Sequence, residues 1–378
     1  MRRLAGVSGP LLVLACAHAP SVPPITAQQS YGRFEPVVAY LQSQVDSAFP
    51  GATIAVGYRD SVVLLAAVGH YGADDKRPVT TETIYDLASL TKVIGLTTAA
   101  MMLVDQGKLD LDAPVQRYVP AFQGANKERV LIRHLLTHSS GMPAWRPLYA
   151  EAKTREEALA LVDTTALLKQ PGDTFVYSDL GAITLTQAVE AITGQRLNDF
   201  LDSRLFGPLG MRSTRYLPPE SWRERIAPTE NDTVFRHRLL RGEVHDENAG
   251  RLGGVSGHAG LFSTAPDLAR FATWLLRLRT IDSLHVRDFI HKQGIPPGSS
   301  RALGWDTPSE NSSAGTKMGP NAFGHTGYTG TSIWMDPDRS LFIILLTNRV
   351  NPTRANTKVF QVRRRVADLV NEILTPPQ

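Results

Sequence analysis

Segments with the pattern of β-strands lie near the two ends of this chain, and the long middle stretch has the pattern of helices. Residues 53–58 and 62–68 are apolar and rich in β-branched side chains, which indicates the two strands of a hairpin. Residues 331–335 and 341–347 form a second pair of the same kind. Because strands and helices do not alternate along the chain, a parallel sheet is disfavoured.

The segments that read as helices are residues 40–47, the stretch from Ser89 to Gly107, and residues 130–137, 155–168, 182–193, 198–205, 266–278 and 359–374. We therefore predict an α+β fold, in which an antiparallel sheet built from both chain ends is flanked by helices. Its α/β lobe would contain residues 33–108 and 263–378, and an inserted helical lobe would contain residues 109–262.

The composition is typical of a globular protein with a large core, since 42% of the 378 residues are hydrophobic and 20% are charged. The formal net charge is only +4, and Arg2 and Arg3 contribute two of these charges. This charge, with one short basic run at 363–365, does not favour nucleic-acid binding. We expect a monomer that binds no nucleic acid.

The first 29 residues resemble an export signal followed by a tether. Arg2 and Arg3 form a charged start, and a short apolar stretch then ends at Cys16 in a sequence similar to a lipobox. Cys16 is the only cysteine of the chain, so the mature fold has no disulfide. We expect either a lipoprotein anchored to the membrane through Cys16 or a periplasmic protein cleaved after Ala27. A disordered cytoplasmic tail is the alternative.

A Ser-x-x-Lys motif, Ser89 to Lys92, lies where the most apolar helix should begin. Residues three apart share one helix face, so Lys92 can reach the hydroxyl of Ser89. A serine becomes a good nucleophile only when a base takes its proton, and a lysine can do so where its surroundings keep part of it neutral. Considered alone, Ser89 could equally be a helix cap.

Two further motifs follow in the chain, Tyr177-Ser178-Asp179 and His325-Thr326-Gly327. Tyr177 can act as a second proton shuttle, because a phenol near cations loses its proton more readily. His325 could supply that positive charge or relay the proton itself. Ser89, Tyr177 and His325 each also have an ordinary structural explanation. The active-site interpretation would fail only if all three of these explanations were true at once.

These motifs and their neighbours resemble the β-lactamase-like serine hydrolases, which include class C β-lactamases, D,D-carboxypeptidases and related esterases. The resemblance covers residues 33–374 and is carried by five segments, at residues 85–92, 135–143, 171–179, 257–264 and 325–328. It agrees with the fold predicted above.

The resemblance implies a role for each catalytic residue. Ser89 would be the acylated nucleophile, Lys92 its proton partner, and Tyr177 the base that also activates the deacylating water. His325 would stand where the family has the lysine of Lys-Thr-Gly. The backbone N–H groups of Ser89 and Tyr328 would form the oxyanion hole.

The same resemblance assigns substrate binding to Asp179, Thr326, Gly327, Asn351 and Arg354. The segment from Asn351 to Arg354 is similar to one that helps class C enzymes to bind the substrate carboxylate, and a forked guanidinium suits that group. An exposed surface loop is an equal alternative for this segment.

Two positions depart from the family pattern. Asp179 stands where the family usually has Asn, and an ionised Asp cannot donate to a substrate carbonyl. Asp179 could instead pair with Lys92 and hold it charged. His325 in place of Lys makes the local charge dependent on pH near neutrality. Both departures predict slow hydrolysis of β-lactams.

Other readings of the sequence are weaker. His134 and His138 lie four apart on a helix, but no third metal ligand is apparent, so we expect no metal and no organic cofactor. Residues 245–248, His-Asp-Glu-Asn, could form a cleft wall or a solvated loop. The expected function is an exported serine hydrolase that acts through an acyl-enzyme on peptidoglycan-derived D-amino-acid peptides, β-lactams or small esters. The alternative is a penicillin-binding or muropeptide receptor without turnover.

Overall fold

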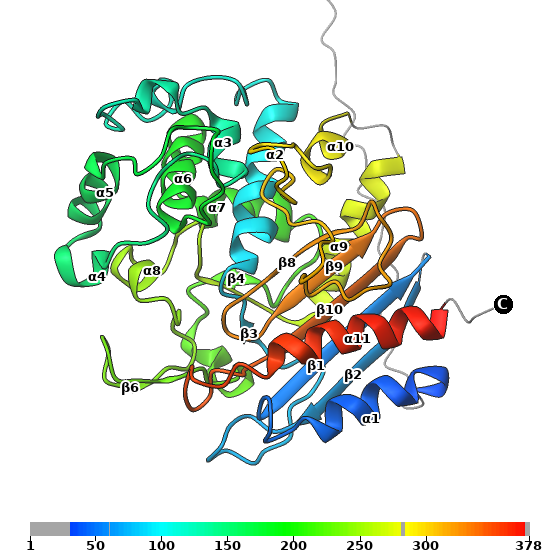
Figure 1. Cartoon of the computed structure of the whole chain (residues 1–378). Helices are drawn as coiled ribbons and strands as arrows, with labels where there is room; N and C mark the ends of the chain where they lie inside the picture. The colour runs from blue at the N-terminus through cyan, green and yellow to red at the C-terminus, as the bar shows by residue number, and fades with distance from the viewer. Residues whose placement is uncertain (1–30, 60, 281–283, 375–378) are drawn as a thin grey trace, which may run out of the picture.

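The computed structural model describes residues 31–59, 61–280 and 284–374. In this part of the chain, the main sheet is antiparallel and contains strands from both chain ends (Figure 1). Its strands are, in spatial order, β2 (Ser61–Gly69), β1 (Gly51–Tyr58), β10 (Leu341–Thr347), β9 (Ser332–Asp336) and β8 (Phe323–Thr326). The predicted α+β fold with a sheet built from the two ends is confirmed.

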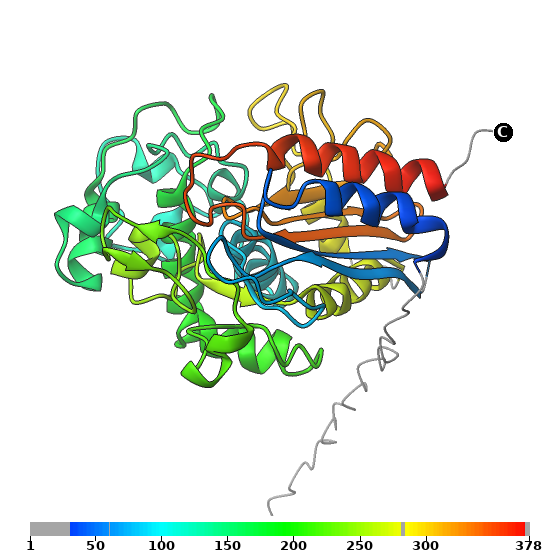
Figure 2. The same cartoon turned by 90° about the horizontal axis from the view of Figure 1, so that it is seen from below.

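Helices cover both faces of this sheet. Figure 2 shows α1 (Glu35–Ser43) and α11 (Val359–Leu374) side by side on one face, and α9 (Ala265–Thr280) packs on the other. Strand β10 is apolar throughout because both of its faces are buried. Ile343 and Leu345 pack with α1 and α11, whereas Phe342 and Ile344 lie in the core that contains α9, as the alternation of a strand requires.

The middle of the chain is mainly helical and lies beside the sheet (Figure 1). Its elements are η2, a π-helical stretch (Lys92–Thr97), α2 (Thr98–Asp105), α3 (Ile132–Leu136), α4 (Leu148–Glu151), α5 (Arg155–Thr164), α6 (Asp179–Thr193), α7 (Leu197–Leu201), η5 (Asp202–Phe206), α8 (Glu247–Arg251) and α10 (Leu284–Ile290). A small sheet of β3 (Tyr85–Asp86), β7 (Leu261–Ser263) and β4 (Arg215–Tyr216) connects this part to the turn before Ser89.

The structure differs from the sequence prediction in several details, including the three that follow. The first helix begins at Glu35 rather than at residue 40, because Pro36 lies in its first turn, where its missing N–H costs nothing. Helix α5 ends at Thr164, four residues early. Strand β8 was not predicted, since its four residues contain Gly324 and have no clear strand pattern.

Cys16 and the proposed export segment lie outside the described residues, so the lipid anchor and the export of the chain stay predictions. Within the described ranges, no helix has both the length and the apolar character that a membrane crossing needs.

Candidate active site

The turn before Ser89 is held in an uncommon conformation. Ala88 has a φ angle of +45°, a backbone conformation that residues other than Gly rarely adopt. The buried carboxylate of Asp86 fixes this turn, because Oδ1 accepts from the N–H of Ala88 at 2.8 Å and Oδ2 accepts from the N–H of His245 at 2.7 Å. The helix then begins at Leu90, so Ser89 projects from its start.

Lys92 contacts Ser89 as the motif predicted, with its buried Nζ donating to Oγ at 3.2 Å. The same Nζ donates to the carbonyl of His258 at 3.0 Å and lies 2.7 Å from Oδ1 of Asp179. Burial favours the neutral amine, but attraction to Asp179 and Tyr177 outweighs it, so the pKa of Lys92 is raised. The predicted pairing of Asp179 with Lys92 is confirmed, and the raised pKa of Lys92 agrees with a charged amine.

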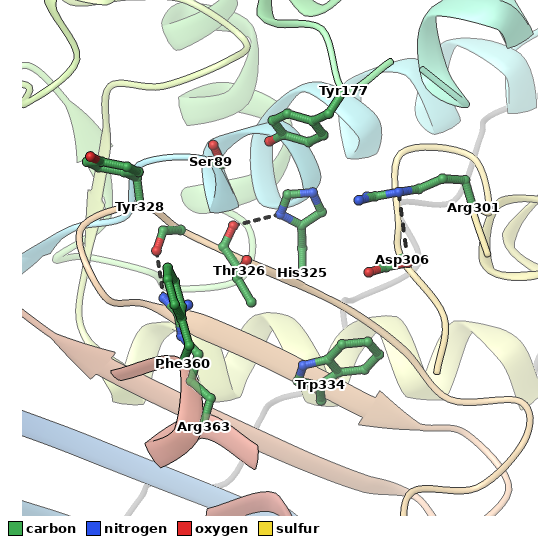
Figure 3. Close-up of a pocket in the computed structure, with 11 residues that line it drawn as sticks. Ser89, Tyr177, Arg301, Asp306, His325, Thr326, Tyr328, Trp334, Phe360 and Arg363 are labelled. Atoms are coloured by element: carbon green, nitrogen blue, oxygen red, sulfur yellow. Dashed lines mark hydrogen bonds and ion pairs between the residues drawn. The ribbon is translucent and has the colours of Figure 1, made fainter. Parts of the chain in front are cut away.

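Tyr177 lies directly before α6 and faces Ser89 (Figure 3). The next residue anchors it, since Ser178 caps α6 through Gly181 and its own N–H donates to Nδ1 of His138 at 3.1 Å. The hydroxyl of Tyr177 is buried and has no hydrogen-bond partner among the described residues. The ring centroid of Tyr177 lies 4.9 Å from Nζ of Lys92, so a cation faces the phenol.

His138 supports this arrangement rather than a metal site. Its ring centroid lies 4.5 Å from that of Tyr177. Burial and the charges of Arg301 and Lys92 lower the pKa of His138 well below 6.5, so it stays neutral and accepts from Ser178.

His325 lies on β8 and differs from expectation in its charge. Its Nδ1 donates to the carbonyl of Thr326 at 2.8 Å, so Nε2 of the neutral ring carries a lone pair, and this atom has no partner among the described residues. Burial, followed by the charges of Arg301 and Lys92, lowers its pKa well below 6.5. The prediction that His325 supplies a positive charge that varies near neutral pH is therefore wrong. A role as a proton relay stays consistent with the free Nε2.

Arg301 supplies a positive charge that sequence reasoning missed. Its Cζ lies 5.6 Å from the ring centroid of Tyr177 and 5.1 Å from that of Phe175. Its Nη1 has no partner within the described structure, and its Nε is 3.8 Å from Asp306. Figure 3 shows Arg301 pointing toward His325. Both line a cavity of about 300 Å³ beside Ser89, as do Thr326 and Gly327.

The loop after β8 brings the backbone of Tyr328 toward Ser89. The side chains of Thr329 and Thr331 donate to the carbonyls of Asp86 at 2.7 Å and Leu87 at 2.9 Å, directly before the nucleophile. Gly327 is required for this approach, because a Cβ there would overlap with the Leu87 carbonyl.

The N–H groups of Ser89 and Tyr328 donate to no acceptor among the described residues. Both donors are therefore available to a substrate oxygen, which agrees with the predicted oxyanion hole.

A second cavity of about 320 Å³ lies on the other side of Ser89 and includes Trp145, Asp179 and Tyr328 in its lining. Its wall contains His245, Asp246 and Glu247, so residues 245–248 form a cleft wall and not a solvated loop. Two contacts hold this wall: His245 pairs with Glu230 at 2.9 Å and Asp246 pairs with His258 at 2.9 Å.

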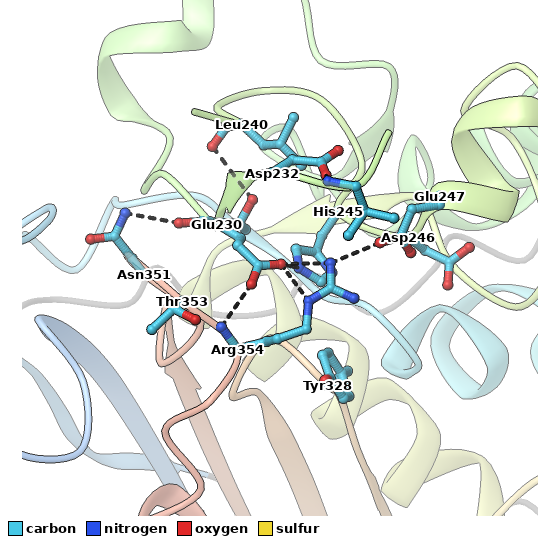
Figure 4. Close-up of polar contacts among 12 residues, drawn as sticks. Glu230, Asp232, Leu240, His245, Asp246, Glu247, Tyr328, Asn351, Thr353 and Arg354 are labelled. Carbon is cyan, nitrogen blue, oxygen red and sulfur yellow. Dashed lines mark hydrogen bonds and ion pairs between the residues drawn. The ribbon is translucent and has the colours of Figure 1, made fainter. Parts of the chain in front are cut away.

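Arg354 and Asn351, which were predicted to bind substrate, already have partners within the protein. Figure 4 shows the guanidinium of Arg354 held by carboxylates, with Nε 2.6 Å from Glu230 and Nη2 2.7 Å from Glu247. Arg354 lines the second cavity, but its charge is already paired. Asn351 is buried and uses both ends of its amide on the backbone, accepting from Ala73 at 3.0 Å and donating to Thr229 at 2.8 Å. Its role is structural.

Comparison with known proteins identifies the family. A family model described as Beta-lactamase matches residues 37–368. The chain belongs to the β-lactamase family. Two Salmonella proteins, from Salmonella schwarzengrund (strain CVM19633) and Salmonella typhi, bear the name "Putative D-alanyl-D-alanine carboxypeptidase"; each is 31% identical over 363 residues, which cover 85% of this chain and 83% of theirs. The family resemblance seen in the sequence is confirmed, and the chain is a β-lactamase-family hydrolase.

Solved structures agree with this fold. A penicillin-binding protein homologue from Caulobacter crescentus has a TM-score of 0.73 at 19% identity and covers 93% of this chain and 100% of its own. EstCE1, a hydrolase with promiscuous acyltransferase activity, has a TM-score of 0.71 at 24% identity and covers 90% of this chain and 98% of its own. A class C β-lactamase has a TM-score of 0.71 at 20% identity and covers 92% and 96%.

Proposed function

We propose that this protein is a serine D,D-carboxypeptidase that forms an acyl-enzyme on Ser89. The observation that carries this proposal is Arg301, which lines the cavity beside Ser89 and whose Nη1 has no hydrogen-bond partner among the described residues. A guanidinium with a free donor binds a carboxylate well, and a peptide that ends in a D-amino acid presents one next to its scissile bond. Arg354, in contrast, is occupied by two carboxylates.

The geometry limits the groups that can take the proton of Ser89. Because Lys92 is charged and donates to Oγ of Ser89, it cannot take the serine proton in this state. Tyr177 and Nε2 of His325 are the free groups facing Ser89, so the proton passes to one of them. Oγ then attacks the scissile carbonyl, whose oxygen accepts hydrogen bonds from the N–H groups of Ser89 and Tyr328.

The collapse of this adduct breaks the C–N bond, and the leaving amine takes up the proton removed from Ser89. The free D-amino acid departs and the acyl group stays on Oγ as an ester. Water then attacks the ester, gives a proton to the same relay, and restores Ser89 with release of the shortened peptide. Esters without a carboxylate fit the same steps but make no use of Arg301, whereas a β-lactam carries a carboxylate next to its lactam nitrogen and fits the same contact.

The relatives support this choice of substrate, because the two Salmonella proteins are named for D-alanyl-D-alanine carboxypeptidase activity. A cell-wall substrate also requires a location outside the cytoplasm. We therefore propose export directed by the N-terminal residues, with a lipid on Cys16 or with cleavage after Ala27.

The role of Arg301 is testable with two substrates that differ in one charge. Diacetyl-L-lysyl-D-alanyl-D-alanine carries the terminal carboxylate, and its C-terminal amide does not. We expect the wild type to prefer the acid, and Arg301→Ala to lose about ten- to hundredfold in kcat/KM on the acid, the worth of one charge-assisted hydrogen bond. Arg301→Ala should change kcat/KM for the amide much less.

Arg354→Ala is the matched control, since it removes an arginine from the other cavity. It should lower thermal stability by removing the cation that pairs with Glu247 and one of the two partners of Glu230, while the preference for the acid persists. If Arg354→Ala lost the preference for the acid while Arg301→Ala kept it, Arg354 would be the residue that binds the substrate carboxylate. That result would refute this proposal.

A second candidate is a receptor that is acylated but does not turn over. The ion pair between Lys92 and Asp179 favours it, because a lysine held charged is a poor base for deacylation. A burst of one equivalent of product without a steady rate would indicate the receptor, and continued release of D-alanine would indicate the carboxypeptidase.

A further inference from the structure

Arg363 is a buried cation without an acidic partner. It lies on α11, is 4% exposed, and its Nη2 donates to the carbonyls of Gly327 at 2.7 Å and Thr331 at 2.8 Å. No ion pair among the described residues includes it, and its Nε has no hydrogen-bond partner there. Figure 3 shows it beneath the loop that carries Tyr328.

Burying an unpaired guanidinium is costly, so its position calls for a physical reason. Burial, with repulsion from Arg349, lowers the pKa of Arg363 to about 9, which still leaves the group charged at neutral pH. A neutral donor could satisfy two loop carbonyls equally well. The charge therefore has an effect on this loop that a neutral side chain would lack.

The acceptor of Arg363 belongs to the oxyanion hole. The carbonyl of Gly327 and the N–H of Tyr328 are the two ends of one peptide group. When a cation donates to the oxygen of a peptide, electron density shifts toward that oxygen, and the N–H at the other end becomes a stronger donor. Thr331 supplies the second acceptor and fixes the orientation of the guanidinium.

We infer that Arg363 is a positioning residue that polarises the Gly327–Tyr328 peptide and so strengthens the oxyanion donor of Tyr328. Because it acts through Tyr328, this role rests on the proposed acyl-enzyme chemistry at Ser89. Arg363 also lines the cavity beside Ser89, but its Nη2 is used by the two loop carbonyls, and in this role its effect reaches the reaction through the N–H of Tyr328.

A second buried arginine provides the matched control. Arg349 is 2% exposed and also holds this loop, with Nε donating to the carbonyl of Tyr328 at 2.8 Å. That carbonyl belongs to the next peptide, between Tyr328 and Thr329, whose N–H does not face the substrate oxygen in the proposed oxyanion hole. Loss of Arg349 would loosen the same loop without removing charge from the oxyanion peptide.

The experiment uses the infrared stretch of the acyl-enzyme carbonyl, which falls in frequency as the oxyanion hole pulls on its oxygen. The full chain is acylated with a penicillin carrying ¹³C at the β-lactam carbonyl, and isotope-edited spectra isolate that band. Arg363→Gln should raise the frequency, and Arg363→Lys, which keeps the charge, should give an intermediate value. Phenylboronic acid, which forms a tetrahedral adduct on Ser89, should bind Arg363→Gln about tenfold more weakly, less than the loss of a whole oxyanion donor.

Arg349→Gln should lower the melting temperature and leave the band unmoved. An equal shift in Arg349→Gln and Arg363→Gln would mean that both act by loosening the loop, and would overturn the inference. So would an unshifted band in a folded Arg363→Gln. If the wild type forms neither the acyl-enzyme nor the boronate adduct, the proposed function fails as well, which separates the two outcomes.

Discussion

At the scale of single residues, the ion pair between Lys92 and Asp179 decides which groups can move protons. Its 2.7 Å contact is buried, and it keeps Lys92 charged although burial alone would favour the neutral amine. The charged Lys92 orients Oγ of Ser89, and Tyr177 and His325 are left as the candidate bases. The family pattern usually has an amide at position 179, so the ion pair with Lys92 is a departure from that pattern.

Asp179→Asn should therefore speed the hydrolysis of β-lactams. The change removes the attraction that raises the pKa of Lys92, so a larger fraction of the amine becomes neutral, and it adds an amide donor for the substrate. We expect nitrocefin turnover to rise about ten- to hundredfold, the value of one charge-assisted hydrogen bond in the transition state. Because the pKa of His325 is well below 6.5, its charge does not vary near neutral pH, and Asp179→Asn can be tested without a substitution of His325.

Glu247→Gln is the corresponding control, because it converts an acid of the same cavity that pairs with Arg354 and not with Lys92. It should not accelerate nitrocefin turnover. A folded Asp179→Asn protein that is no faster than wild type would show that the Lys92–Asp179 pair does not limit the reaction.

The sequence predicted the residues that lie in short motifs and missed their distant partners. Ser89 and Lys92 are three residues apart, so helical geometry alone places them together. Arg301 and Asp86 carry no local signal, because their roles depend on contacts with Tyr177 and His245, which lie far away in the chain. Likewise, nothing in the segment around Arg354 indicates that Glu230 pairs with it.

At the scale of elements, the site depends on how closely the loop between β8 and β9 approaches the turn before Ser89. Two threonine side chains bind this loop to the carbonyls of Asp86 and Leu87. Gly327 leaves no room for a side chain at the closest point. The position of the Tyr328 N–H is thus set by packing of the backbone rather than by the Tyr328 side chain, which is 49% exposed.

Gly327→Ala should impair catalysis more than folding. The added Cβ would overlap with Leu87 and Thr331, so the loop must move away from Ser89 and take the Tyr328 N–H with it. Loss of one oxyanion donor costs about 10²- to 10³-fold in kcat, and we expect a loss of this order in ester hydrolysis.

Gly181→Ala provides the comparison, since a Cβ in α6 would meet only ordinary contacts at 3.7 Å. Alanine favours a helix over glycine, so this variant should be as stable as wild type or more so. Wild-type kcat in Gly327→Ala would contradict the placement of the oxyanion hole.

Long elements with a continuous pattern were predicted well. Helix α11 and strand β10 were predicted with the observed ends, because each is amphipathic or apolar along its whole length. Strand β8 was missed although it carries His325, since its pairing with β9 and not its own composition makes it a strand. Tertiary pairing of this kind leaves no trace in a four-residue segment.

At the scale of the whole molecule, sheet and helical part meet around two buried histidines. His138 and His325 are both nearly inaccessible and both have a pKa well below 6.5, because burial and the nearby cations oppose their charging. The unfolded chain has no such restriction and takes up protons on both below pH 6.5. Folding stability therefore depends on pH in this range.

The sign follows from linkage. Below pH 6.5 the unfolded state binds more protons than the folded state, so the free energy of unfolding falls as the pH falls. For two histidines the loss should be about 2 kcal/mol between pH 6.5 and 5.5, measured by urea unfolding. His325→Asn should reduce that loss by about half. An unchanged slope in His325→Asn would show that His325 is charged in the folded protein.

The central claim is that Ser89 carries the acyl group. Intact-protein mass spectrometry after exposure to benzylpenicillin and to diacetyl-L-lysyl-D-alanyl-D-alanine tests it most directly. We predict a mass increase equal to one penicillin, mapped to the peptide that contains Ser89, and no increase in Ser89→Ala. With the peptide substrate we predict release of D-alanine by the wild type only. An adduct that persists in Ser89→Ala, or D-alanine release that survives the substitution, would contradict the account.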